Sequence, residues 1–346
     1  MCSKESKVLW LSQEECIEAG ALDMLMVLKN VENANLWLAE GKTTETDLVH
    51  LVWEPGAYAS KRIGISSALI RAEETRVGAI KGIPSNPENP LKRGLPRSNG
   101  LVILYNEDTG LPISVMDGTI ISSMRTGASS AIGAKYCANP DSEVLGLVGC
   151  GVIQDTCIEA TSLVMKNIKT VRLYDTNKEK AEKFAGKWAA KLGYTFEICN
   201  QAEQAVADSD IVHTCTNVNL GQEYIKKEWI KKGSFHSAVS MWDYRDEAIL
   251  QGCNKYCMDW KYRLKDRKYP LTELSISGRL DPREIVELGE IISGKSRCRE
   301  SHDDAVFFAT LGLCITDTAN AYQIYQNALA KGLGTQVYQW KSPYNF

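Results

Sequence analysis

The sequence lacks any long apolar run and any strong excess of one charge. Its hydrophobic stretches fall well short of the roughly 20 residues that cross a bilayer, so we expect no membrane partner. The formal net charge of -3 gives no electrostatic reason to expect nucleic acid as a partner. Residues 1–7 are polar and carry no secretion-signal core, which favours a cytoplasmic location.

Signs of a metal site are equally sparse. The 11 cysteines are an odd number scattered through apolar stretches, which is typical of reduced thiols packed as small hydrophobic groups. Cys253 and Cys257 come nearest to a ligand pair, but their spacing is not that of a zinc knuckle and no second pair lies nearby. The four histidines have no spacing suited to a metal or a hydrolase triad. We therefore expect no metal.

The chain is long enough for two domains, and its two parts have different patterns. The first part mixes helical apolar spacing over residues 21–40 with short strand-like pieces bounded by Pro and Gly. It ends in a predicted helix over residues 117–137 whose small side chains would let another backbone approach closely. From residue 144 short apolar strands alternate with helices, which is typical of βαβ units and a buried parallel sheet. Residues 304–330 are predicted to be helical and to pack back on the first part.

A glycine-containing turn follows the first apolar strand of the second part. Residues 149–154, Gly-Cys-Gly-Val-Ile-Gln, come directly after Val144–Val148 and open a helix, which is the context of a dinucleotide-binding fingerprint. Gly149 would permit the tight turn, and Gly151 would let a pyrophosphate approach the helix N-terminus. Gln154 replaces the third glycine of the common pattern. A plain strand-to-helix turn is the alternative, and the acid at the end of the next strand favours the dinucleotide.

That acid is Asp175, which could accept hydrogen bonds from the adenine ribose and would repel a 2′-phosphate. This favours NAD over NADP, although Asp175 could instead cap the helix that follows. Small polar residues at the end of a later strand could line the ribose and nicotinamide, or could simply form side-chain turns. The cofactor site is predicted to comprise Thr126, Gly149, Gly151, Val152, Ile153, Asp175, Cys215, Thr216, Asn217 and Val239.

Four charged residues could bind or transform a substrate. Lys81 ends an apolar stretch, where it either serves function or lies on an edge strand. Arg125, on the helix rich in small residues, could clamp a carboxylate bidentately or form a surface or intersubunit ion pair. Arg62 is a weaker anchor that could simply face solvent. Asp243 follows an apolar strand and could act as a general acid or base, or as a loop or capping carboxylate.

These patterns predict an α/β fold made of a Rossmann-type parallel-sheet domain and a discontinuous α+β domain. The parallel-sheet domain, residues 139–311, would bind NAD. The α+β domain would comprise residues 1–138 with 312–346.

The sequence resembles the ornithine cyclodeaminase/mu-crystallin family over nearly its whole length. Within that family it is similar to the branch that makes 2,3-diaminopropionate for siderophores from N-(2-amino-2-carboxyethyl)-L-glutamate. The closing block Phe308-Ala309-Thr310-Leu311-Gly312 lacks the lysine usual in cyclodeaminases. The resemblance rests on residues 79–82 (Ala-Ile-Lys-Gly), 122–128 (Ser-Ser-Met-Arg-Thr-Gly-Ala), 149–152, 240–243 (Ser-Met-Trp-Asp) and 311–317; the branch rests on 92–104, 224–229 and 258–260.

The resemblance implies a homodimeric, NAD-dependent enzyme of amino acid metabolism. Its α+β domain would bind substrate and form the subunit interface. Lys81 and Arg125 would bind the substrate carboxylate, and Asp243 would act on the amine or on water. Arg62 is a further candidate for substrate binding, and Lys81 for catalysis. Oxidation at the α-carbon would give an imine, and its hydrolysis would release 2-oxoglutarate and 2,3-diaminopropionate. The alternatives are an ornithine cyclodeaminase, a ketimine reductase or amino acid dehydrogenase, and a non-catalytic crystallin-like binding protein.

Overall fold

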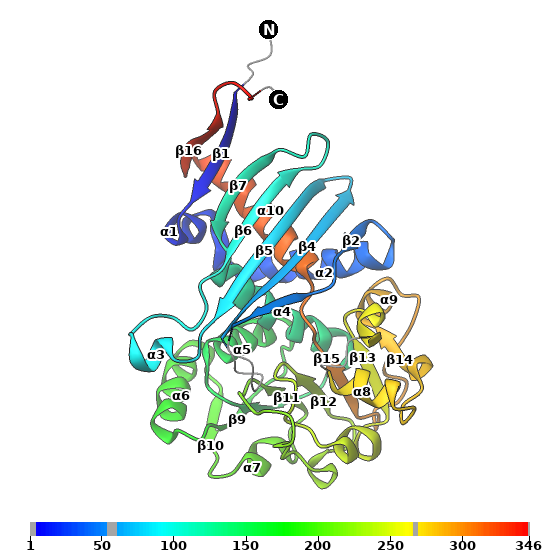
Figure 1. The fold of residues 1–346 in the computed structure, drawn as a ribbon. Helices are drawn as coiled ribbons and strands as arrows, with labels where there is room; N and C mark the ends of the chain where they lie inside the picture. The colour runs from blue at the N-terminus through cyan, green and yellow to red at the C-terminus, as the bar shows by residue number, and fades with distance from the viewer. Residues whose placement is uncertain (1–4, 54–60, 266–268, 345–346) are drawn as a thin grey trace. The chain divides into compact units, whose positions relative to one another are not determined.

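The chain divides into two compact units, each built on its own sheet (Figure 1). The computed structural model describes residues 5–53, 61–265 and 269–344. Unit 1 comprises residues 1–125 and 313–346, and unit 2 comprises residues 126–312. The division lies within helix α4 (Thr119–Cys137), whereas the sequence placed the boundary at the end of this helix. Because α4 runs without interruption across residues 125 and 126, no loop or turn marks this division in the sequence.

Unit 1 is the discontinuous α+β part that the sequence predicted. Its sheet runs β16-β1-β7-β6-β5-β4-β2, and β3 also pairs with β4. Neighbouring strands are antiparallel except β1 and β7, which are parallel. The strands are β1 (Ser6–Leu11), β2 (Thr43–Glu45), β3 (Val49–Val52), β4 (Arg62–Ala72), β5 (Thr75–Ser85), β6 (Leu101–Asn106), β7 (Pro112–Asp117) and β16 (Thr335–Trp340).

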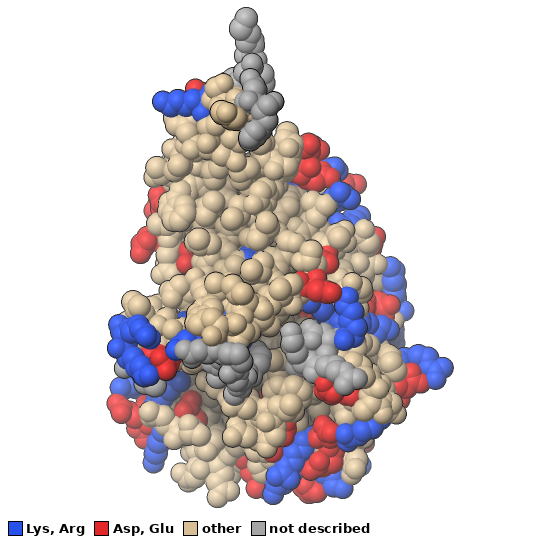
Figure 2. Space-filling view, viewed as in Figure 1, with Lys and Arg blue, Asp and Glu red and all other residues tan. Residues whose placement is uncertain are grey.

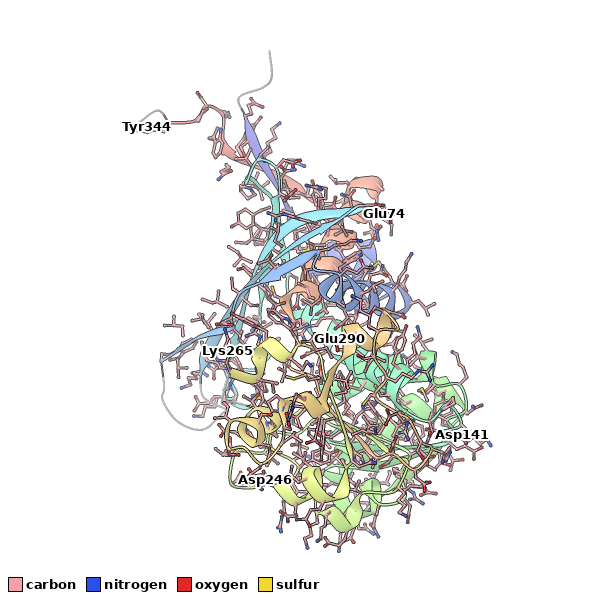
Figure 3. The ribbon with its side chains drawn as sticks, turned by 90° about the vertical axis from the view of Figure 1, so that its right-hand side faces the viewer. Glu74, Asp141, Asp246, Lys265, Glu290 and Tyr344 are labelled. Atoms are coloured by element: carbon pink, nitrogen blue, oxygen red, sulfur yellow. The ribbon has the colours of Figure 1, made fainter. Side chains whose placement is uncertain are left out.

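One face of this sheet is covered by helix α10 (Cys314–Lys331), which also packs on α2 (Met24–Ala39). Side chains alternate across the strands, so Val77, Ala79 and Lys81 of β5 point into this core while Ile80 points away. The turn between β4 and β5 carries Glu74, labelled in Figure 3. The unit also contains the short helices α1 (Gln13–Cys16) and α3 (Asn89–Lys92) and the π-helical turn η1 (Ile17–Ala21).

Unit 2 contains a parallel sheet in the order β10-β9-β8-β11-β12-β15-β13-β14. The first strand of the unit, β8, lies inside the sheet, and the chain winds outward from it first through β9 and β10 and then through β11 and β12. This reversal between β8 and β11 is the switch point of a doubly wound Rossmann fold, so the predicted fold class is confirmed. The strands are β8 (Val144–Val148), β9 (Thr170–Tyr174), β10 (Thr195–Ile198), β11 (Ile211–Thr214), β12 (Phe235–Ala238), β13 (Lys255–Met258), β14 (Ile285–Glu287) and β15 (Val306–Ala309).

Helices α5 (Val152–Val164) and α6 (Lys178–Leu192) connect the first three strands of this sheet. Apart from the second part of α4, the remaining helical pieces of unit 2 are short. They are α7 (Ala202–Val206), α8 (Pro270–Ile276), α9 (Leu288–Ile292) and the turns η2 (Lys227–Trp229), η3 (Ala248–Gly252), η4 (Lys261–Lys265) and η5 (Pro282–Glu284).

The prediction of one helix over residues 304–330 is wrong. Val306–Ala309 forms strand β15 between β12 and β13, and α10 begins only at Cys314. The four residues of β15 are all buried because both faces of the parallel sheet are covered. Such a short continuous apolar run has no period that separates a buried strand from a buried helix.

The predicted close packing of the small residues of α4 is present within unit 2. A Cβ atom on Gly127 would lie 2.3 Å from the backbone carbon of Thr156 in α5. A Cβ atom on Gly133 would lie 2.6 Å from the ring of Phe308 in β15. Glycine at these positions therefore lets α4 approach both the helix and the sheet.

Within the described ranges, no helix combines the length and apolarity needed to cross a bilayer. Over the same residues, no group of three or more His, Cys, Asp or Glu is arranged to hold a metal ion. The cysteines of these ranges form no disulfide.

Gly127→Ala should lower the melting temperature, although alanine is the better helix former. The added methyl group overpacks the α4–α5 contact, at a cost of about 1–3 kcal/mol. Gly186→Ala in α6 is the matched control, because nothing lies within 4 Å of its Cβ position. We expect that control to gain about 0.5–1 kcal/mol. Thermal unfolding of both variants tests the packing, and a Gly127→Ala protein as stable as the wild type would contradict it.

Candidate functional site

The glycine turn after β8 has the geometry of a dinucleotide-binding loop. Gly149 has φ +89°, and a Cβ atom there would lie 2.5 Å from the carbonyl oxygen of Cys215. Gly151 is the N-cap of α5, and no side chain accepts a hydrogen bond from the helix N-terminus at this cap. Nothing lies within 4 Å of a Cβ atom built on Gly151, and Val152 beside it is exposed. The first N–H groups of α5 therefore face open space, which suits a pyrophosphate.

The position of the third glycine is adapted to its replacement. Gln154 is fully buried, and its Nε2 donates to the carbonyl oxygen of His213 in β11 at 3.3 Å. Ile153 before it is half-buried. The glutamine thus holds α5 on the sheet by a hydrogen bond.

Asp175 lies directly beyond β9, next to this loop. Its Oδ2 accepts a hydrogen bond from the N–H of Cys150 at 2.8 Å, and its Oδ1 accepts one from Asn177 at 2.9 Å. The alternative reading of Asp175 as a helix cap is wrong, because Asn177 caps α6 by accepting from Lys180. Asp175 therefore places a carboxylate at the glycine loop, as binding of a ribose requires.

A series of contacts continues along the carboxyl edge of the sheet. Cys215, directly after β11, lies against Gly149, and its N–H donates to the carbonyl oxygen of Val148 at 2.8 Å. The N–H of Thr216 donates to Oγ of Ser240 at 3.0 Å. The ends of β8, β9, β11 and β12 thus meet at one edge. Val239 is half-buried at the end of β12, whereas Asn217 is exposed beyond β11.

Asp243 lies at the far end of this edge and is fully buried. The hydroxyl groups of Thr216 and Tyr224 donate to its Oδ1, the latter at 3.1 Å, and that of Ser240 donates to Oδ2. Three hydroxyl donors thus hold both carboxylate oxygens. The chain continues to the exposed Asp246, labelled in Figure 3. Asp243 is therefore neither a surface carboxylate nor a helix cap.

The environment of Asp243 acts on its pKa in two opposing directions. Burial raises the pKa above its ordinary value, whereas the hydroxyl groups of Ser240, Thr216 and Tyr224 oppose that rise. A buried carboxyl group with a raised pKa is suited to accept and return a proton. Burial lowers the pKa of both His213 and His236 to about 3, so these core histidines are neutral.

Unit 1 contains a second buried charged group. Lys81 Nζ lies 2.5 Å from Asp317 Oδ2, and Arg125 Nε lies 3.1 Å from Asp317 Oδ1. All three side chains are buried, and another nitrogen of Arg125 donates to Ser122 Oγ at 3.3 Å. Since β5 lies between β4 and β6, Lys81 is not on an edge strand. The three groups sum to one positive charge, which suits the binding of a carboxylate.

Arg62 lies at the start of β4, half-buried, opposite Ser85. It shares a sheet face with Ser66, which lies opposite Lys81. Ser66 lies four positions along the strand from Arg62, or roughly 13 Å away. Arg62 and Lys81 thus point to the same side of the sheet but are not brought into contact by the strand register.

Thr126 is half-buried in α4, one residue before the Gly127 contact with α5. Sequence reasoning missed three partners of the charged residues: Asp317, Tyr224 and Ser240. Asp317 was visible only as an acid in a helix with polar and apolar residues intermixed. Ser240 and Tyr224 lie in segments that carry the family resemblance, but a hydroxyl group in a loop is common and did not by itself indicate a contact with Asp243.

The family model for the ornithine cyclodeaminase/mu-crystallin family matches residues 22–332. N-((2S)-2-amino-2-carboxyethyl)-L-glutamate dehydrogenase of Staphylococcus aureus is 32% identical over 286 residues, which are 82% of this chain and 84% of that protein. An archaeal alanine dehydrogenase dimer with bound NAD has a TM-score of 0.85 and 29% identity, covering 97% of this chain and 100% of its own.

A second solved structure, the Thermococcus litoralis Delta(1)-pyrroline-2-carboxylate reductase in complex with NADH and L-proline, also has a TM-score of 0.85 and 29% identity. It covers 95% of this chain and 100% of its own. These relatives agree with the prediction of NAD as the cofactor, and the resemblance inferred from the sequence is confirmed. The chain belongs to the ornithine cyclodeaminase/mu-crystallin family.

Proposed function

We propose that this chain is an NAD-dependent oxidoreductase that oxidises the α-carbon–nitrogen bond of an N-carboxyalkyl amino acid. The observation that carries the proposal is the hydrogen-bonded edge of unit 2. There, one run of contacts leads from the glycine turn through Cys215 and Thr216 to the buried Asp243. A dinucleotide-binding loop and a general acid/base thus share one sheet edge, as a dehydrogenase requires.

NAD fits the residues of this edge. The open N-terminus of α5 suits the pyrophosphate, and Asp175 suits the adenine ribose. Thr126, Ile153, Asn217 and Val239 complete the proposed site. NAD, when bound, accepts the hydride that leaves the α-carbon. All other chemistry falls to residues of the chain.

The proposed substrate is N-(2-amino-2-carboxyethyl)-L-glutamate. Loss of a hydride from the glutamate α-carbon and of a proton from its nitrogen gives an imine, and water adds to that imine. Breaking the carbon–nitrogen bond then releases 2-oxoglutarate and 2,3-diaminopropionate, with NADH and one proton as the other products. Asp243 takes the proton from the nitrogen or from the attacking water.

The buried cations of unit 1 provide the anchor for the substrate's α-carboxylate. Arg125 presents a planar fork and Lys81 a point charge, while Asp317 holds both in place. A buried cation pair is strongly desolvated, so its interaction with an incoming carboxylate is stronger than it would be at the surface. Arg62 is proposed to contact a more distant part of the substrate from the same sheet face.

This substrate is supported by the 32% identity to the Staphylococcus aureus enzyme that bears its name. A direct amino acid dehydrogenase is the second candidate, favoured by the archaeal alanine dehydrogenase, which covers 97% of this chain. A cyclodeaminase would recycle NAD without net redox change. Supply of 2,3-diaminopropionate for siderophores and a cytoplasmic location remain predictions.

Purified protein incubated with NAD and N-(2-amino-2-carboxyethyl)-L-glutamate should produce NADH and equal amounts of 2-oxoglutarate and 2,3-diaminopropionate. NADH absorbance and product masses measured together test this outcome. L-Alanine and L-ornithine are the comparison substrates. NADH with pyruvate from L-alanine alone would identify the second candidate, and proline from L-ornithine without NADH would identify a cyclodeaminase.

We also propose that the chain is a homodimer joined through unit 1. Trp10, Val115, Ile103 and Ile80 are direct neighbours across four strands, on the sheet face turned away from α10. Trp10 is 45% exposed and Ile80 is 39% exposed. Figure 2 shows largely uncharged surface over strands β4 to β7. Continuous exposed apolar surface of this kind is typical of a subunit interface, and a monomeric mass in analytical ultracentrifugation would exclude the dimer.

Arg125→Lys should raise the KM for the substrate and thereby lower kcat/KM by roughly 10- to 100-fold. The substitution keeps the charge beside Asp317, so the melting temperature should change little, but it removes the fork that binds a carboxylate. Arg279→Lys is the matched control, because Arg279 pairs with Asp246 at the surface. Equal kinetics for the two variants would refute a role of Arg125 in substrate binding.

Asp175→Asn should lower the ratio of kcat/KM for NAD to that for NADP by roughly tenfold or more. The amide oxygen can still accept a hydrogen bond from Cys150, so the loop is retained while the charge that repels a 2′-phosphate is lost. Steady-state kinetics with both cofactors measure the ratio. An unaltered ratio would remove Asp175 from the cofactor site.

A further inference from the structure

Asp243 is a buried carboxylate whose described side-chain contacts are all with neutral hydroxyl groups. Two of these hydroxyl groups have other acceptors in reach. Ser240 Oγ also lies 3.0 Å from the carbonyl oxygen of Thr214, and Thr216 Oγ1 lies 3.5 Å from Ser240 Oγ. The hydroxyl of Tyr224 has Asp243 Oδ1 as its one hydrogen-bond partner in the described chain.

The backbone fixes Tyr224 against Asp243. The N–H groups of Tyr224 and Ile225 donate to the carbonyl oxygen of Asp243 at 3.0 and 2.9 Å. Ile225 in turn bridges to Tyr244, and the N–H of Arg245 donates to Ile225 at 3.0 Å. The side-chain contact therefore follows from main-chain pairing, and removing the hydroxyl leaves that pairing in place.

We propose that Tyr224 is a positioning residue that keeps Asp243 ionised and orients its Oδ1 for proton transfer. This role rests on the function proposed above, because it presumes that Asp243 is the general base. A hydroxyl group that donates to a carboxylate stabilises the charged form, and donation to a charged acceptor is stronger than between neutral groups.

The groups around Asp243 explain why the loss of a single hydroxyl group should change its pKa. The titratable groups that interact with it are Cys215 from the end of β11, Tyr224 and Tyr244. Burial raises the pKa of all three above their ordinary values, and the Asp243 charge adds to that rise, so all are neutral near pH 7. His236, which is hydrogen-bonded to the hydroxyl group of Tyr244, is neutral as well because burial lowers its pKa to about 3. In the described chain the Asp243 charge is compensated by hydroxyl dipoles.

Tyr224→Phe should shift the acidic limb of the kcat/KM pH profile upward by about one pH unit. Without the hydroxyl, the pKa of Asp243 rises, so the base is protonated over a wider range of pH. At high pH the variant should approach wild-type activity. Tyr256→Phe is the matched control, because its hydroxyl donates to the carbonyl oxygens of Ile249 and Cys253 in the same core. A variant slowed by the same factor at every pH would overturn the proposal.

The melting temperature tests the role of Tyr224 without a measurement of enzyme activity. Burial raises the folded-state pKa of Asp243 above its unfolded value, so stability is lost as the pH rises from the unfolded pKa to the folded pKa. Tyr224→Phe raises the folded pKa further and extends that window upward. The loss in melting temperature relative to wild type should therefore be small at low pH and grow as the pH rises through the window. A loss that does not vary with pH would contradict the proposal.

The Asp243→Asn variant distinguishes a failure of the proposed function of Asp243 from a failure of the proposed role of Tyr224. If that variant retains turnover, the proposed function of Asp243 fails. If it loses turnover with NAD binding intact while Tyr224→Phe leaves the pH profile unshifted, only the role of Tyr224 fails. In an Asp243→Asn background, Tyr224→Phe should show no pH-dependent loss of stability. Should Tyr224→Phe alone fail to fold, the double variant should fold, and its failure would overturn the proposal.

Discussion

A carboxylate removed from water must be compensated by its surroundings, and the candidate site depends on how this chain does so. Desolvation of an ionised group costs roughly several kcal/mol even after relaxation. Asp317 is compensated by two cations, and Asp243 by three hydroxyl groups. The first arrangement surrounds a charge with opposite charges, whereas the second surrounds it with dipoles alone. A binding anchor needs the former, and a proton acceptor needs the latter.

The parallel sheet brings the second arrangement and the glycine turn together. Winding outward from β8 in both directions places the ends of β9, β8, β11 and β12 side by side. Only glycine fits at position 149, because a Cβ atom there would collide with Cys215 at the end of the neighbouring strand. The residue after Cys215 donates to Asp243. Topology therefore links a backbone turn to a carboxylate nearly one hundred positions later in the sequence.

Much of this could be predicted because its causes are local. Gly149, Gly151 and Asp175 follow strands of apolar residues, and their context can be read within about thirty positions. The prediction of one helix over residues 304–330 was wrong because the four buried apolar residues of β15 have the same pattern in a buried strand and in a buried helix. For Asp317 and Tyr224, no local pattern indicated the side chains that they contact. Asp317 is paired with a lysine 236 positions away, a separation that propensity and periodicity cannot bridge.

The two charged groups also differ in what a substitution would disturb. The arginine fork and the lysine both contact Asp317, so loss of either cation leaves a buried acid with a remaining partner. Asp243 has no such second charge, since each of its donors is a neutral dipole and two of them have another acceptor in reach, as Ser240 has in the carbonyl oxygen of Thr214. A charge supported in this way responds to small changes around it. Proton transfer requires that responsiveness, because the group must be nearly as stable with the proton as without it.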